Sequence, residues 1–217
     1  MIQNIKIWWD NLSVNWKREL QHIYPINLEI FVHNNIYEPS FKNSYNEFYI
    51  HENNPDFYKY NHLLSSVNTL TIGWRDIDYP EISVQVEDFE PLIRFVNLEA
   101  LWFFSDLVLS YHFDSLENLK HIKAMELQTQ NMENINFCTN YFNLEYLVIR
   151  NAFGLSSLSP LRHLNKLKYL NVSKSNIYSI ECLIDKSISY LNISNTLVPL
   201  REINTFKKFN PNAIIQI

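Results

Sequence analysis

One apolar pattern occurs six times along this chain of 217 residues and constrains its fold more than any other feature. The pattern is Φ-x-x-Φ-x-Φ, where Φ is a large apolar residue and x is any residue. The copies VNTLTI, LEALWF, IKAMEL, LEYLVI, LKYLNV and ISYLNI begin at Val67, Leu98, Ile122, Leu144, Leu167 and Ile188. Their starts are 31, 24, 22, 23 and 21 residues apart. This spacing predicts a solenoid whose coils each supply one short strand, paired in parallel with the strand of the next coil.

A second pattern lies between the copies of the first and keeps the same phase. It has four positions. The first is apolar, the second is any residue, the third is Pro, Ser, Phe or Cys, and the fourth is Leu or Cys. Its copies begin at Phe89, Phe113, Ile135, Leu158, Ile180 and Leu197. Apolar residues follow at helical or 3₁₀ spacing, which predicts the return segment of each coil. The apolar sides of the strands and the return segments would then fill one continuous core.

Together these two patterns resemble leucine-rich repeats, particularly those of bacterial proteins that have 21–23-residue repeats with an L-x-P-L return. The resemblance covers about residues 57–217. It implies a right-handed α/β solenoid with a parallel sheet on the concave side and helical or 3₁₀ segments on the convex side. The segment WWDNLSVNWKREL is also similar to the W-x-x-L-x-x-x-W-K helix that caps small bacterial members of this family.

The strand exits differ from the family pattern, which often has an asparagine ladder there. The equivalent residues here are Arg75, Asp106, Gln130, Ala152, Ser175 and Thr196. Three asparagines, Asn131, Asn176 and Asn195, lie one place away. We therefore expect the ladder to be shifted or partly lost.

We expect one structural domain in two parts, an N-terminal cap over residues 1–66 and about six repeats over 67–217. In the cap, Ser13 can act as the N-cap of a helix over about 13–23 that buries Trp16, Leu20 and Ile23. Alternation over residues 26–32 predicts a strand, and residues 33–56 carry no clear pattern. At the other end, the pattern predicts a helical turn that stops before Pro211 and a short closing strand.

Composition excludes several classes of function. The chain has only two glycines, so it lacks the glycine cluster with which nucleotide-binding loops approach phosphate. Its net charge of −5 argues against a nucleic-acid partner, which needs a basic face. No apolar run approaches the roughly 20 residues of a membrane span. Asp10 interrupts the apolar N-terminus, so we expect no signal peptide and a cytoplasmic protein.

Catalytic and metal-binding patterns are absent from the sequence. Cys138 and Cys182 occupy core positions of the second pattern, two repeats apart, which predicts two buried thiols without a disulfide. The seven histidines show no metal-ligand spacing, and His121 and His163 are expected at the surface. Asp76, Asp78 and Glu81 form the densest acidic cluster, but calcium loops need a glycine turn that is missing here. We predict no catalytic, cofactor-binding or metal-binding residues.

The concave face gives the strongest indication of function. Positions three, five and seven of each strand copy point away from the core, because side chains alternate along a strand. These positions carry aromatic and charged residues on neighbouring coils, namely Trp102, Phe104, Glu126, Tyr146, Arg150, Tyr169 and Tyr190. Tyr, Trp and Arg are enriched in binding hot spots, and an exposed aromatic patch is typical of an interaction site.

This face predicts a non-catalytic module that binds another protein, with Trp102, Phe104 and the three tyrosines as anchors. Glu126 and Arg150 would position the partner through its charged groups. Three alternatives remain open. The tyrosines could simply form a ladder that stabilises neighbouring strands. The aromatic rings could stack on sugars in a carbohydrate-binding module, or a Cys–His or carboxylate pair could serve an enzyme. The partner and the oligomeric state, whether monomer or self-associated, stay open.

Overall fold

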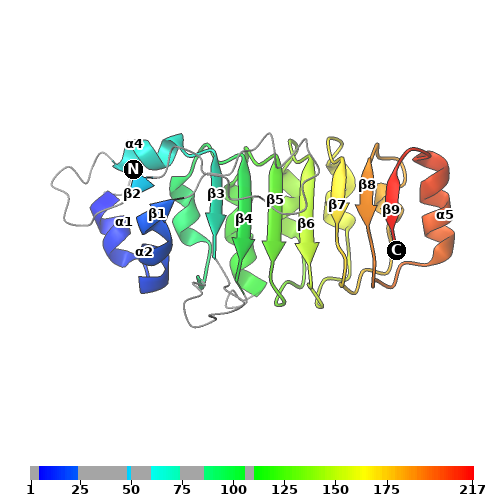
Figure 1. Cartoon of the computed structure of the whole chain (residues 1–217), viewed down its shortest axis with the longest axis horizontal. Coiled ribbons are helices and arrows are strands. Elements are labelled where there is room, and N and C mark those ends of the chain that lie inside the picture. The colour runs from blue at the N-terminus through cyan, green and yellow to red at the C-terminus, as the bar shows by residue number, and fades with distance from the viewer. Residues whose placement is uncertain (1–4, 24–47, 50–59, 74–85, 106–109) are drawn as a thin grey trace.

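The computed structural model describes residues 5–23, 48–49, 60–73, 86–105 and 110–217. Its main feature is a parallel sheet of seven strands in the order β3-β4-β5-β6-β7-β8-β9. The strands lie across the long axis of the molecule and follow one another along it (Figure 1). The strands are β3 Thr69–Ile72, β4 Ala100–Phe104, β5 Ala124–Gln128, β6 Tyr146–Arg150, β7 Tyr169–Asn171, β8 Tyr190–Asn192 and β9 Ile214–Gln216. The order in the sheet is the order in the sequence, which confirms a solenoid with one strand per coil.

The register of the sheet matches the repeat pattern residue by residue. Position three of each copy lies beside position three of the next, as Tyr146 does beside Tyr169 and Tyr169 beside Tyr190. Positions four and six point inward, and Leu70, Leu101, Met125, Leu147, Leu170 and Leu191 are buried in one core cluster. We call the opposite side of β3–β9, which carries positions three, five and seven, the outer face of the sheet.

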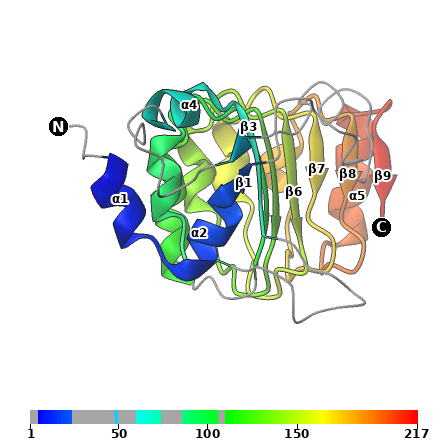
Figure 2. The same ribbon diagram turned by 60° about the vertical axis from the view of Figure 1, so that its left-hand side comes forward.

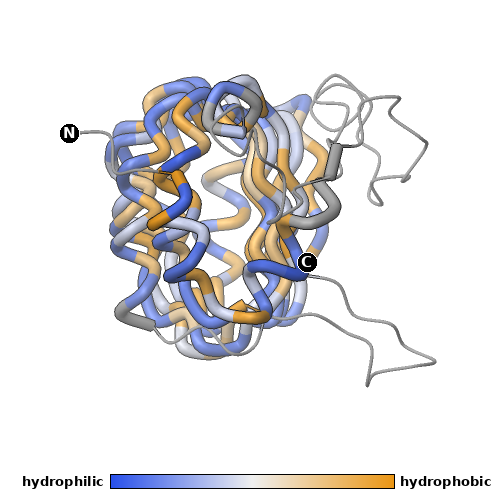
Figure 3. Tube along the Cα trace, turned by 90° about the vertical axis from the view of Figure 1, so that its left-hand side faces the viewer, coloured by the Kyte–Doolittle hydropathy of each residue, from blue (hydrophilic) through white to orange (hydrophobic). Residues whose placement is uncertain are grey.

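Short turns on the other side return the chain to the next strand. They are the 3₁₀ segments η3 Glu90–Arg94, η4 Ser110–Asn118, η5 Asn136–Asn140, η6 Ser159–His163 and η7 Glu181–Leu183, followed by the helix α5 Leu200–Phe209. Viewed along the solenoid axis, strands and returns form the two sides of a flattened coil (Figure 3). Apolar residues of both sides, such as Leu158 and Leu161 of the fourth return, are buried in the same core as the strands.

The N-terminal cap contains two consecutive helices, α1 Ile5–Asn11 and α2 Val14–Gln21, beside the first coils (Figure 2). The Ser13 hydroxyl accepts a hydrogen bond from the Trp16 backbone N–H at 3.2 Å, which confirms its role as N-cap of α2. Trp16 and Leu20 are buried as expected. Helix α1 was not expected from the sequence. Helix α2 ends earlier than expected, because Ile23 already belongs to a two-stranded antiparallel ribbon, β1 His22–Ile23 with β2 Phe48–Tyr49.

The other expectations for the two ends of the chain are partly confirmed and partly concern residues that the structure does not describe. The strand predicted over 26–32 and most of 33–56 lie outside the described residues. A further helix, α4 Tyr60–Ser66, precedes β3. At the C-terminus, α5 stops before Pro211 and β9 closes the sheet, which confirms the prediction. In the part of the chain that the structure describes, no helix is both long and apolar enough to cross a membrane. The cytoplasmic location stays a prediction.

At two strand exits a hydroxyl group occupies the position where the family pattern has asparagine. Ser175 donates to the Val172 carbonyl at 2.6 Å, and Thr196 donates to the Ile193 carbonyl at 2.7 Å. Asn176, one place after Ser175, donates from its side-chain amide to the Phe153 carbonyl of the preceding coil. The expected shift of the ladder is therefore present at Asn176. Separately, Asn171 and Asn192 accept the backbone N–H of Ser173 and Ser194, which places polar amides on the outer face.

Candidate functional site

The outer face of the sheet brings the three predicted tyrosines into one stack. The ring centroids of Tyr146 and Tyr169 are 4.3 Å apart with 15° between the planes, and those of Tyr169 and Tyr190 are also 4.3 Å apart with 9° between the planes. The stack follows from the parallel register, which aligns identical positions on coils about 4.8 Å apart. Ala100, Ala124 and Val148 complete this second apolar cluster, which is separate from the main core.

The expected exposure of these tyrosines is wrong. Tyr146, Tyr169 and Tyr190 are only 3%, 5% and 4% exposed, so the residues are as buried as many core side chains. Stacking is one physical reason, because Tyr169 has an aromatic neighbour against each face of its ring. The tyrosines therefore stabilise the sheet in the way that the ladder alternative described. Their direct contact with a partner stays a prediction.

A buried ion pair lies next to this stack. Glu126 of β5 is 2% exposed, and Arg150 of β6 donates a hydrogen bond to its carboxylate from the guanidinium. Burial raises the pKa of the Glu126 carboxyl, and the charge of Arg150 with hydrogen bonding by Arg150 and Trp102 opposes that rise. The Arg150 side chain is 32% exposed, so one end of the guanidinium is held by a buried carboxylate while the side chain still reaches the surface.

Trp102 and Phe104 of β4 are half-buried and lie on the same face. The parallel register sets Trp102 beside Glu126, and Phe104 beside Gln128, which in turn lies beside Arg150. The structure thus places all seven predicted residues on one face, spread over strands β4 to β8. It divides them into a buried tyrosine stack and a half-buried group of Trp102, Phe104 and Arg150 with Glu126 beneath.

Polar amides extend the outer face toward β9, and the sequence analysis did not include them in the site. Tyr190 and Asn192 both donate to the side-chain oxygen of Gln216, at 2.7 Å and 2.8 Å. Asn171 and Asn192 occupy position five of their copies, so the alternation that identified Trp102 and Glu126 also pointed to them. The predicted site contained only aromatic and charged residues, so these amides were not part of it.

The candidate catalytic residues are not gathered into a site. Cys138 and Cys182 are free and buried, as predicted, and burial raises the pKa of both thiols. The Cys182 thiol donates to the Leu158 carbonyl at 3.2 Å. A raised pKa lowers the fraction of reactive thiolate. His121 and His163 are exposed. The described residues hold no group of three potential metal ligands, and Asp76, Asp78 and Glu81 lie outside them.

One parallel strand per coil, 3₁₀ returns and a single continuous core define this chain as a solenoid with the leucine-rich-repeat fold. Among solved structures, it is similar to an internalin (inlF) from Listeria monocytogenes, with a TM-score of 0.51 and 21% identity, over 60% of this chain and 39% of that chain. It is also similar to internalin C2 from the same organism, with a TM-score of 0.52 and 16% identity, over 72% of this chain and 83% of that one.

A leucine-rich-repeat protein of Leptospira interrogans matches with a TM-score of 0.50 and 17% identity, over 61% of this chain and 35% of that chain. The match with the inlF internalin thus spans about two fifths of that protein's length. No protein-family model and no curated protein matches the sequence. At these identities the likeness establishes the fold.

Proposed function

We propose that this protein is a non-catalytic module that binds another protein through the outer face of its sheet. Trp102, Phe104 and Arg150 would make the first contacts, because they combine aromatic and cationic groups with accessible surface. Trp and Arg are among the residue types that contribute most to protein–protein affinity. The observation that carries the proposal is the ion pair, in which buried Glu126 fixes a partly exposed Arg150 on the same face as Trp102 and Phe104, which lie two strands away.

A fixed Arg150 is more useful for binding than a free one. A long side chain on an open surface loses rotamer entropy when a partner immobilises it. Here the bond to Glu126 has already restricted the guanidinium, so less entropy is lost on binding. Arginine has five N–H donors, and its planar group can hold a second acceptor, such as a carboxylate of the partner.

The tyrosine stack supports this proposal in a different way. Tyr146, Tyr169 and Tyr190 tie three consecutive strands together on the outer face, which keeps the sheet rigid next to the contact residues. The structural likeness to internalins agrees with an interaction role, although a shared fold alone does not determine function. The sugar-binding alternative relied on exposed rings, and no observation of the outer face favours it over a protein partner.

A cross-linking experiment tests the proposed face. We would place the photo-reactive residue p-benzoylphenylalanine at Phe104 and, as the matched control, at Phe142, an exposed phenylalanine in the turn after η5 on the return side. Each variant is irradiated in a lysate of the source organism. We expect a discrete cross-linked protein from position 104 and none from position 142. The product should disappear when Arg150→Gln is added.

The opposite pattern would contradict the proposal. A product from position 142 alone would place the partner on the return side of the solenoid. A product from position 104 that is unaffected by Arg150→Gln would retain the face but remove the role of the ion pair. Circular dichroism and thermal melts must first show that each variant is folded.

A further inference from the structure

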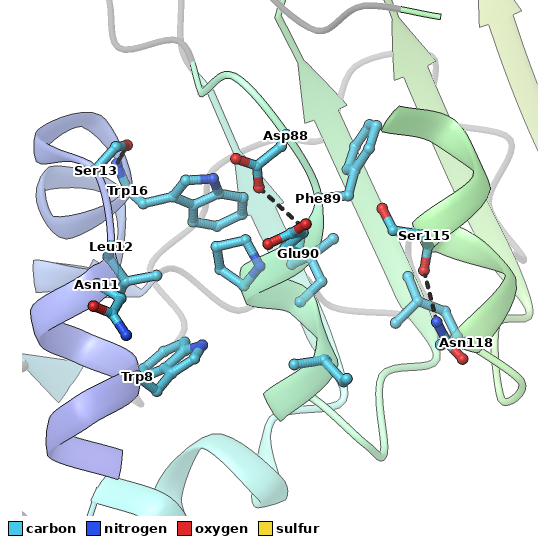
Figure 4. Close-up of a pocket in the computed structure, with 14 residues that line it drawn as sticks. Trp8, Asn11, Leu12, Ser13, Trp16, Asp88, Phe89, Glu90, Ser115 and Asn118 are labelled. Atoms are coloured by element: carbon cyan, nitrogen blue, oxygen red, sulfur yellow. Dashed lines mark hydrogen bonds between the residues drawn. The ribbon is translucent and has the colours of Figure 1, made fainter. Parts of the chain in front are cut away.

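A pocket lies between the N-terminal cap and the first return segments, away from the outer face of the sheet. It has a volume of about 500 Å³, within the usual range for ligand pockets. Trp8, Leu12 and Trp16 line it from the cap, and Phe89 and Leu92 line it from the η3 region. Figure 4 shows both tryptophan side chains reaching from their helices toward η3 across the pocket.

Two hydrogen-bond donors in these walls have no acceptor. Trp8 is 6% exposed and Trp16 is 1% exposed, yet the indole Nε1 atom of neither residue has a hydrogen-bond partner among the described residues. Buried N–H groups are nearly always paired in folded proteins, since leaving one unpaired is unfavourable. Both nitrogens are closed off from solvent in this structure. Their side chains line the pocket, so a small rotation of each indole would present its N–H to a ligand that enters between the helices and η3.

The charges around the pocket restrict the chemistry of that ligand. Asp88 and Glu90 line it on one side, and one Asp88 oxygen accepts the backbone N–H of Glu90 at 2.9 Å (Figure 4). These carboxylates disfavour an anionic acceptor and favour a cation. The Arg94 guanidinium lies over the Trp8 ring, 5.7 Å from its centroid, so a ligand cation fits better on the Asp88 side. A fitting ligand has neutral acceptors, apolar surface and one positive charge.

We infer that this pocket binds an extended, proline-rich peptide segment of a partner protein that carries a lysine or arginine. Backbone carbonyls of the peptide would accept the Nε1–H groups of Trp8 and Trp16, and its basic side chain would pair with Asp88. An extended proline-rich segment suits these walls because it forms no internal hydrogen bonds and leaves its carbonyls free. Proline also has no backbone N–H that an apolar wall would leave unpaired, and its ring packs well against aromatic side chains.

The experiment uses the whole chain and a capped peptide of sequence PPPKP with a fluorescent label. Fluorescence anisotropy should show saturable binding. Trp8→Phe and Trp16→Phe each remove one N–H and keep an aromatic ring, so each should weaken binding about fivefold. The matched control is Trp9→Phe, since Trp9 is a fully buried neighbour in α1 that does not line the pocket, and it should leave the affinity unchanged. Asp88→Asn should weaken the lysine peptide more than a norleucine peptide.

A second measurement needs no variant to stay folded. In a ¹⁵N NMR titration of the wild-type protein, two of the five tryptophan indole signals should shift with the peptide. No saturable binding up to several millimolar, or equal losses from Trp8→Phe and Trp9→Phe, would overturn the inference. Binding of a neutral oligosaccharide such as chitotetraose, weakened by Trp8→Phe in place of the peptide, would also overturn it and identify a sugar pocket. These outcomes are independent of the cross-linking at Phe104.

Discussion

Gly73 ends the first strand of the large sheet with a left-handed backbone, φ +76°. A Cβ added there would lie 1.8 Å from the carbonyl oxygen of Phe104, which belongs to the backbone of the next strand and cannot move aside. We expect Gly73→Ala to lower the free energy of unfolding by about 3 kcal/mol, through backbone strain and the clash. Urea denaturation measures this loss. Gly154→Ala, whose Cβ would lie 2.9 Å from the Met132 oxygen, should cost clearly less, and equal losses would contradict the explanation.

Glu19 in α2 should make the stability depend on pH. Its carboxylate accepts the backbone N–H of Gly73 at 2.8 Å, and burial raises its pKa from 4.5 to about 7. Because the folded state then holds a proton that the unfolded state releases, the contribution of Glu19 is full below pH 4.5 and is lost as pH rises toward 7. We expect a decrease on the order of 2 kcal/mol across this range, which guanidinium denaturation at a series of pH values would show.

The matched variant for this pH dependence is Glu19→Gln, which keeps an oxygen acceptor for Gly73 and cannot ionise. Its stability should vary less over the same pH range than that of the wild type. Burial raises the pKa of Asp88 and Glu126 as well, so a smaller slope in the same direction should remain. An unchanged slope in Glu19→Gln would show that other groups cause the pH dependence.

Among the structural elements, strand β7 carries buried side chains on both of its faces. Tyr169 stacks between two tyrosines on the outer face, and Leu170 is fully buried in the main core. The exposed position that the sequence predicted for Tyr169 would make Tyr169→Ala nearly harmless to folding. The stacked geometry leads to a different expectation, a loss of about 3 kcal/mol, similar to that of Leu170→Ala, because both changes leave a cavity. Thermal and urea melts of the two variants test this, and a much smaller loss for Tyr169→Ala would restore the original expectation.

The elements differ in how well the sequence predicts them, and the reasons are physical. Strands β3–β8 and the 3₁₀ returns follow from apolar residues at fixed spacing, because each coil must bury the same positions. Helix α1 buries Ile5, Trp8 and Trp9 at the i, i+3, i+4 spacing of a helix, but a segment of only seven residues depends on its packing against the core for stability, which the sequence does not show. Alternation also predicted which residues share the outer face, but it could not predict how much of each tyrosine ring the neighbours cover. The cap pocket likewise depends on contacts between distant segments.

For the whole molecule, the core is one continuous cluster from the cap helices to α5. Each coil contacts mainly its neighbours, so a disruption in a central coil separates the two halves of the solenoid. Leu147 of the central strand β6 is fully buried, and we expect Leu147→Asp to abolish cooperative unfolding by burying an unpaired charge. Circular dichroism with hydrogen exchange would measure this. Phe142→Asp changes an exposed residue only five positions earlier and should have little effect, so equal damage from both would contradict the explanation.

In three successive coils, the residue that follows position seven of the pattern has a left-handed backbone conformation. The residues are Asn151, Lys174 and Asn195, with φ of 62°, 56° and 56°. The coils can therefore be compared with one another like related sequences. A residue found in one coil can be placed at the equivalent position of another coil to raise its stability. Asparagine tolerates this conformation better than lysine, so Lys174→Asn should raise the unfolding free energy by about 0.5 kcal/mol. A urea melt that shows no gain would mean that each coil has adapted to its own neighbours, and that equivalent positions are not interchangeable.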